Sequence, residues 1–119
     1  MEVGDKVEMI IHLNSDIFDV VDNGIKCVEG RVNDEKRRKL HIGDKLIFLR
    51  RPDEIDRIEA IVEDLVYYDN FEEMIKDYSM EEIYLGGYNK EYYLELIKRF
   101  YSEEEISKYG VVAIKFKKL

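Results

Sequence analysis

Five separate segments of this 119-residue chain alternate apolar with polar side chains, and this pattern constrains the fold more than any other feature. A period of two residues is typical of strands that bury one face against a core. The predicted strands cover residues 7–13, 28–32, 45–49, 58–68 and 112–116. In the fourth of them the period slips at Glu63 and Asp64, which predicts a β-bulge.

Between these segments, apolar residues recur at helical spacing. A short helix is predicted to begin at a capping Ser15 and to end at Gly24. Two more are predicted over 71–78 and 93–100, and a further helical turn follows Ser102. Strands and helices that do not alternate regularly indicate a small α+β protein, with about five or six strands in a curled sheet or barrel and three or four short helices outside it.

Composition favours one compact cytoplasmic domain over residues 1–119. Hydrophobic residues make up 45% of the chain and aromatic residues 12%, which argues against disorder. The single cysteine, Cys27, cannot form an internal disulfide, and no Cys or His cluster has zinc-site spacing, so we expect neither metal nor cofactor. The first residues lack a secretory pattern and no apolar run is long enough to span a bilayer, so we expect no membrane association.

Charge divides the chain into three parts. Residues 1–25 carry a net −5, residues 26–51 carry +5 and residues 52–119 carry −8. The acidic total of −8 argues against a protein that coats nucleic acid by bulk electrostatics. The positive segment is either a local anion-binding face or a solvated stretch that pairs with acidic neighbours.

The candidate site lies in that positive segment, where residues 24–31 contain a lysine, a carboxylate and an arginine. On a strand, Glu29 and Arg31 point to the same face, so they either pair or meet a common ligand. Lys26 has the wrong parity and joins them only if the preceding turn re-aims it. Gly30, with no side chain, leaves room for a ligand to approach the backbone.

The chemistry of these residues remains open from the sequence. A partly buried lysine near Arg31 has its charged form disfavoured and can act as a base or nucleophile, whereas Glu29 favours the ammonium. The planar guanidinium of Arg31 is better suited to binding phosphate, carboxylate or a base edge.

The same segment resembles the ASCH domain family, the activating-signal-cointegrator homology group of PUA-like barrels, whose hallmark is Gly-x-Lys-x-x-Glu-x-Arg. Its four fixed positions are occupied here by Gly24, Lys26, Glu29 and Arg31. Residues 33–44 and 101–114 are also similar to bacterial and archaeal members. The resemblance implies a PUA-like β-barrel with helices packed outside, a cleft near residues 24–31 and a structural role for Gly24.

The resemblance further implies binding of RNA or of a nucleotide or nucleoside. Lys26, Glu29 and Arg31 are the expected ligand-binding residues, and Arg37 and Arg38 extend the contact along the RNA backbone. The alternative is an amidohydrolase of an acylated nucleoside such as 4-acetylcytidine, with Lys26 and Glu29 catalytic. Related hydrolases have a threonine at the position of Glu29. A third possibility is a protein-interaction domain that uses the acidic C-terminal half.

Several other side chains are also candidates, and some of them have two interpretations. The basic residues at 36–39 and 50–51 either follow a nucleic-acid backbone or belong to solvated turns. Tyr67 and Tyr68 offer a stacking surface for a base, although one of two adjacent strand residues normally faces the core. Packing or rim positions on an outer helix are expected for Tyr92, Tyr93 and Tyr101. Cys27 is interpreted as a small buried hydrophobe on an interior strand.

Overall fold

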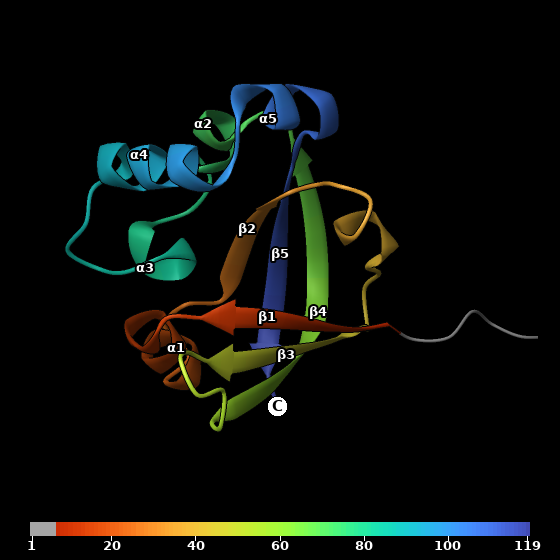
Figure 1. Ribbon diagram of the computed structural model, residues 1–119, viewed down its shortest axis with the longest axis vertical. Helices are drawn as coiled ribbons and strands as arrows, with labels where there is room; N and C mark the ends of the chain where they lie inside the picture. The colour runs from red at the N-terminus through yellow and green to blue at the C-terminus, as the bar shows by residue number, and fades with distance from the viewer. Residues whose placement is uncertain (1–6) are drawn as a thin grey trace, which may run out of the picture.

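A curled sheet of five strands organises residues 7–119, the part of the chain that this computed structural model describes (Figure 1). The strands are β1 (Glu8–Leu13), β2 (Val28–Val32), β3 (Lys45–Arg50), β4 (Arg57–Tyr68) and β5 (Val111–Lys118). Their order in the sheet is β1-β3-β4-β5-β2, with β1 parallel to β3 and the other neighbours antiparallel. The sheet curls into a half-barrel, which confirms the predicted α+β fold class. The expectation of no secretory signal rests mainly on residues outside the described range.

The longest strand, β4, contains the predicted β-bulge. Val62 pairs with Phe116, whereas Asp64 pairs with Lys115, so β4 has one extra residue between these pairs. A bulge bends a strand and increases its twist. The twelve-residue strand can therefore follow the curl of the sheet without a break.

Within residues 7–119, five short helices lie outside the sheet (Figure 1). They are α1 (Ser15–Asp22), α2 (Phe71–Met74), α3 (Met80–Ile83), α4 (Lys90–Phe100) and α5 (Glu103–Tyr109), and a 3₁₀ turn, η1 (Arg37–Lys39), joins β2 to β3. Helices α2 to α5 group around β2 and one end of β4 and β5, while α1 lies beside the ends of β1 and β3. The helical side of the molecule is therefore built mainly from the acidic second half of the chain.

The predicted helix over 71–78 is wrong in extent, because α2 ends at Met74 and a separate helix, α3, follows. A second helix start signal follows at Ser79. Ser79 Oγ accepts a hydrogen bond from the Glu82 N–H at 3.2 Å, and Glu82 Oε1 accepts one from the Ser79 N–H at 2.9 Å. This capping box begins a new helix. The expected cap of α1 was also displaced by one residue, from Ser15 to Asn14.

Two hydrophobic clusters cover the two faces of the sheet. The first fills the curl, where the rings of Phe48 and Phe116 lie 4.9 Å apart. The second lies between the sheet and helices α2 to α5 and includes Phe71 and Met74. Along β2, Val28 and Val32 belong to this second cluster, so Glu29 and Arg31 point to the opposite face.

Gly30 also faces the helices, and the space above it is already filled. A Cβ at this position would lie 2.8 Å from Met74 Cε and 3.0 Å from the Tyr93 hydroxyl, so the room expected here for a ligand is taken by the protein itself. We expect Gly30→Ala to lower the free energy of unfolding by about 1–3 kcal/mol through overpacking, measured by urea denaturation. Gly86→Ala is the control, because the nearest atoms that a Cβ there would meet belong to the Glu81 side chain, at 3.3 Å or more. Equal stability of the two variants would contradict the prediction.

Candidate functional site

A tight turn after α1 brings Lys26 into the candidate site. Gly24 adopts a φ of +84°, a conformation that side chains disfavour, and its N–H donates to the Val21 carbonyl at 3.1 Å. The Lys26 N–H then donates to the Val20 carbonyl at 2.9 Å. Lys26 therefore lies in the turn before β2, and the alternation of side chains along the strand does not determine where it points. The turn therefore re-aims Lys26 toward Glu29 and Arg31, which is the condition under which the sequence predicts that the three residues act together.

The ammonium of Lys26 is enclosed by three acceptors. Nζ donates to the carbonyls of Val28 and Ile83, both at 2.6 Å, and lies 3.0 Å from Glu29 Oε1. The side chain is only 2% exposed. Burial lowers the pKa of Lys26 below its usual value, while the charge of Glu29 opposes that change. Because an ammonium has three protons, the three acceptors match the charged form and leave no lone pair facing a ligand.

Glu29 lies between Lys26 and Arg31 and contacts both of them. Its Oε1 faces Lys26, and its Oε2 accepts from Arg31 Nε at 2.8 Å and lies 2.7 Å from Arg31 Nη2. Burial alone would raise the pKa of this carboxyl, but the charges of Lys26 and Arg31 lower it to about 2. Glu29 is therefore ionised at neutral pH and fixes the position of the arginine.

Arg31 is the member of this trio that reaches solvent. Its side chain is 23% exposed, compared with 9% for Glu29. Although burial opposes the change, Glu29 and the Tyr101 hydroxyl raise the pKa of Arg31. A guanidinium held in this way presents fixed donors to an anion.

Two further predicted ligand residues lie after β2. Arg37 Nε is buried and makes no hydrogen bond within residues 7–119. Burial, together with the nearby charge of Arg31, lowers the pKa of Arg37. Arg38 donates to the Asn33 carbonyl at 2.8 Å and lies over the Tyr109 ring at 5.5 Å. The structure therefore groups Arg37 with Arg31, and places Arg38 against a helix-side tyrosine.

The other sequence candidates lie elsewhere or pack. Arg50 lies 2.9 Å from both Asp19 and Asp56, which fits the interpretation as a cation paired with acidic neighbours. Cys27 was expected on an interior strand, but it precedes β2, which is an edge strand, and it is partly exposed. The Tyr68 hydroxyl donates to Asp77 Oδ2 at 2.7 Å, whereas Tyr67 is exposed.

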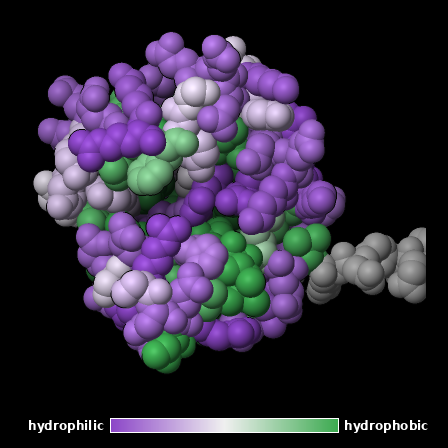
Figure 2. Space-filling model, in the orientation of Figure 1, coloured by the Kyte–Doolittle hydropathy of each residue, from purple (hydrophilic) through white to green (hydrophobic). Residues whose placement is uncertain are grey.

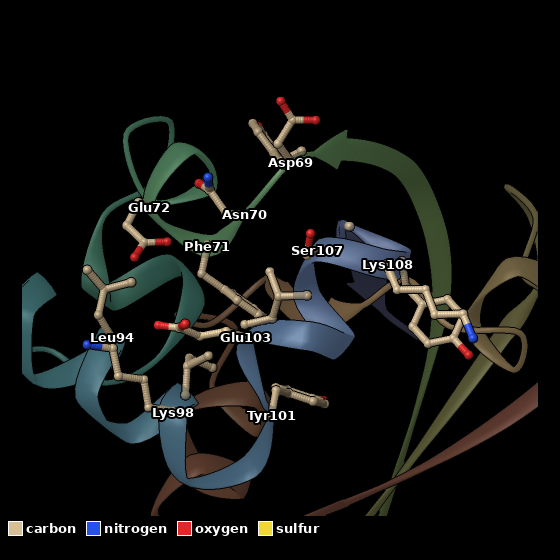
Figure 3. Close-up of a pocket in the computed structure, with 15 residues that line it drawn as sticks. Asp69, Asn70, Phe71, Glu72, Leu94, Lys98, Tyr101, Glu103, Ser107 and Lys108 are labelled. Carbon is tan, nitrogen blue, oxygen red and sulfur yellow. The ribbon is translucent and has the colours of Figure 1, made fainter.

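Sequence reasoning missed a pocket of about 670 Å³ among α2, α4 and α5 (Figure 3). Its walls include Phe71, Ile97, Tyr101 and Tyr109. The Phe71 and Tyr101 rings stack with centroids 5.9 Å apart and planes at 17°. Tyr101, expected only as a packing or rim residue, therefore contributes both to this pocket and to the surroundings of Arg31.

The surface on the open side of the curl is hollowed between the helical part and strands β1 and β3 (Figure 2). Hydrophilic side chains surround this hollow, and hydrophobic ones gather below it over the strands. Among residues 7–119, no group of three His, Cys, Asp or Glu side chains is placed to hold a metal ion. No helix in the same range is long and apolar enough to cross a membrane.

The half-barrel fold agrees with the result of the family comparison. The chain belongs to the ASCH domain family, which matches residues 11–119. A comparison with curated proteins finds no match.

Several solved structures have the same fold. The crystal structure of hypothetical protein PH0355 is 31% identical, with a TM-score of 0.83 over 95% of this chain and 100% of that chain. The solution structure of protein PF0455 from Pyrococcus furiosus is 29% identical, with a TM-score of 0.73 over 95% of this chain and 98% of that chain. A mutant of the ZmASCH protein from Zymomonas mobilis shares 17% identity and a TM-score of 0.61, over 97% of this chain and 70% of that one, which shows likeness of fold.

Proposed function

We propose that this ASCH domain binds single-stranded RNA through Arg31, Arg37 and Arg38. The observation that carries the proposal is the electrostatic coupling of Arg31, near the end of β2, with Arg37, at the start of η1. Their charges are close enough to influence one another, and Arg37 Nε has no partner within the described residues. A phosphate beside the two guanidinium groups would relieve this repulsion.

Lys26 and Glu29 have a positioning role in this proposal. The buried ammonium neutralises one side of the Glu29 carboxylate, and the other oxygen orients the Arg31 guanidinium. The enclosure of Lys26 Nζ by three acceptors favours a binding role over the amidohydrolase alternative, since a nucleophile or base needs an accessible lone pair.

The acidic remainder of the protein limits where RNA can lie. The chain carries −8 overall, yet residues 26–51 carry +5 and contain all three arginines of the proposed site. Phosphates are attracted to that segment and repelled by most of the remaining surface. The contact should therefore be local and depend on salt.

Arg31→Ala is expected to weaken RNA binding by about 1–3 kcal/mol, because it removes the oriented guanidinium. Affinity is measured by anisotropy of a labelled single-stranded oligoribonucleotide at two salt concentrations. Arg57→Ala is the control. Arg57 is an exposed arginine that pairs with Glu59, and it lies at the start of β4, outside the positive segment 26–51. Binding that is absent, or indifferent to salt and to Arg31, would overturn the proposal. If the native protein hydrolyses 4-acetylcytidine and the Lys26→Ala variant does not, the result would instead support the amidohydrolase alternative.

A further inference from the structure

We infer that the pocket among α2, α4 and α5 receives one unstacked RNA base, and that it prefers bases with an exocyclic amino group over uracil. This inference rests on the proposed RNA binding and adds a base preference to it. It is carried by three features of the pocket: the aromatic floor, the carboxylates at its mouth, and the cations outside its tyrosine walls.

The floor of the pocket suits a flat ring. Phe71 is 1% exposed and Ile97 is 8% exposed, so both are fixed by the second hydrophobic cluster. Tyr101 is partly exposed and its ring stacks on the buried Phe71, so Tyr101 is the aromatic surface of the pocket that a base can reach. A pocket of about 670 Å³ is ample for a base, and aromatic surfaces bind bases by stacking.

The mouth of the pocket carries acceptors for amino groups. Glu72 and Glu103 line it from α2 and α5, and Figure 3 shows both reaching toward the space between these helices. The lysines of the lining are engaged with other groups, because Lys98 lies 3.5 Å from Glu95 and Lys108 lies over the Tyr109 ring at 5.1 Å.

This set of groups discriminates among ligands. Carboxylates accept hydrogen bonds from the amino groups of cytosine, adenine or guanine. They oppose the carbonyl oxygens that dominate the uracil edge, and they repel phosphate. The pocket therefore fits the base of a nucleotide and not its phosphate.

Cations lie where the phosphates of such a nucleotide would pass. Arg38 covers the ring of Tyr109, and the Tyr101 hydroxyl raises the pKa of Arg31. Both tyrosines also line the pocket. One RNA segment can thus place a base between the helices while its backbone follows the arginines.

The test compares homopolymeric oligoribonucleotides of equal length, oligo(rC), oligo(rA) and oligo(rU), at one salt concentration. We expect the protein to bind oligo(rC) and oligo(rA) at least about fivefold more tightly than oligo(rU). Glu103→Gln should reduce this ratio toward one. Glu104→Gln is the matched control, because Glu104 is its exposed neighbour in the first turn of α5, has the same charge and does not line the pocket. Neither variant alters the capping box of Ser102 and Glu105.

Taking a ratio of affinities cancels the general electrostatic gain from removing one negative charge. Equal, salt-dependent binding of all three oligonucleotides would overturn the base pocket while leaving RNA binding intact. A preference reduced equally in Glu103→Gln and Glu104→Gln would also overturn it. If none of the oligonucleotides binds, the proposed function itself fails.

Discussion

Glu29→Gln is expected to lower the free energy of unfolding by about 3–5 kcal/mol, because it leaves a buried ammonium without its counter-charge. Lys26 is 2% exposed and would retain the two backbone carbonyls but lose its carboxylate partner. The single amide oxygen of Gln can accept from Lys26 or from Arg31 but not from both, so one of these two cations would face the amide NH2 group. Equilibrium denaturation in urea at neutral pH measures this change.

Glu59→Gln is the matched control for that experiment. Glu59 also lies on a strand and also pairs with a lysine and an arginine, Lys45 and Arg57, but these groups are accessible to solvent. Exposed pairs contribute little, so we expect a small effect there. The single variant Lys26→Met and the double variant Lys26→Met/Glu29→Gln complete a double-mutant cycle with Glu29→Gln. The cycle isolates the coupling free energy between Lys26 and Glu29. Similar losses for Glu29→Gln and Glu59→Gln would contradict the buried pair.

The second large effect is on pH dependence. The pKa of Glu29 falls from a usual value near 4.5 to about 2 in the folded protein, because Lys26 and Arg31 outweigh its burial. A lowered carboxyl pKa gives stability that is complete above the unfolded value and is lost as the pH falls through the folded value. The contribution of Glu29 should therefore decline by about 3 kcal/mol between pH 5 and pH 2.

Other carboxylates titrate over the same range, so the informative quantity is a difference. We expect the gap in unfolding free energy between the native protein and Glu29→Gln to narrow as the pH falls. Urea denaturation of both proteins at several pH values measures it. A gap that stays constant from pH 5 to pH 2 would show that the Glu29 carboxyl titrates alike in the folded and unfolded states.

Much of the fold follows from local pattern. The five alternating segments became the five strands, and the slip at Glu63 and Asp64 became the bulge of β4. These features depend on neighbours along the chain, which the sequence displays directly. The split of the predicted 71–78 helix was visible too, because Ser79 and Glu82 have the same spacing as Ser102 and Glu105.

The site depends more on contacts distant in sequence. The motif indicated that Glu29 and Arg31 share a face, and they do pair. It did not indicate that Lys26 donates to the carbonyl of Ile83, fifty-seven positions away. The pocket likewise brings Phe71 beside Tyr101, a contact that no periodicity encodes. Such pairings arise only when α2 to α5 fold back onto β2.

The hydrogen bond from Lys26 to the Val28 carbonyl also bears on self-association. Strand β2 is the last strand of the sheet, and the Cys27 carbonyl accepts from the Phe116 N–H of β5. Because successive carbonyls along a strand point to opposite sides, the Val28 carbonyl points outward from the edge. Open edges invite strands from other molecules. The Lys26 side chain occupies this carbonyl and ties it to α3 through Ile83. The lysine that pairs with Glu29 therefore also leaves the Val28 carbonyl unavailable to a strand of another molecule.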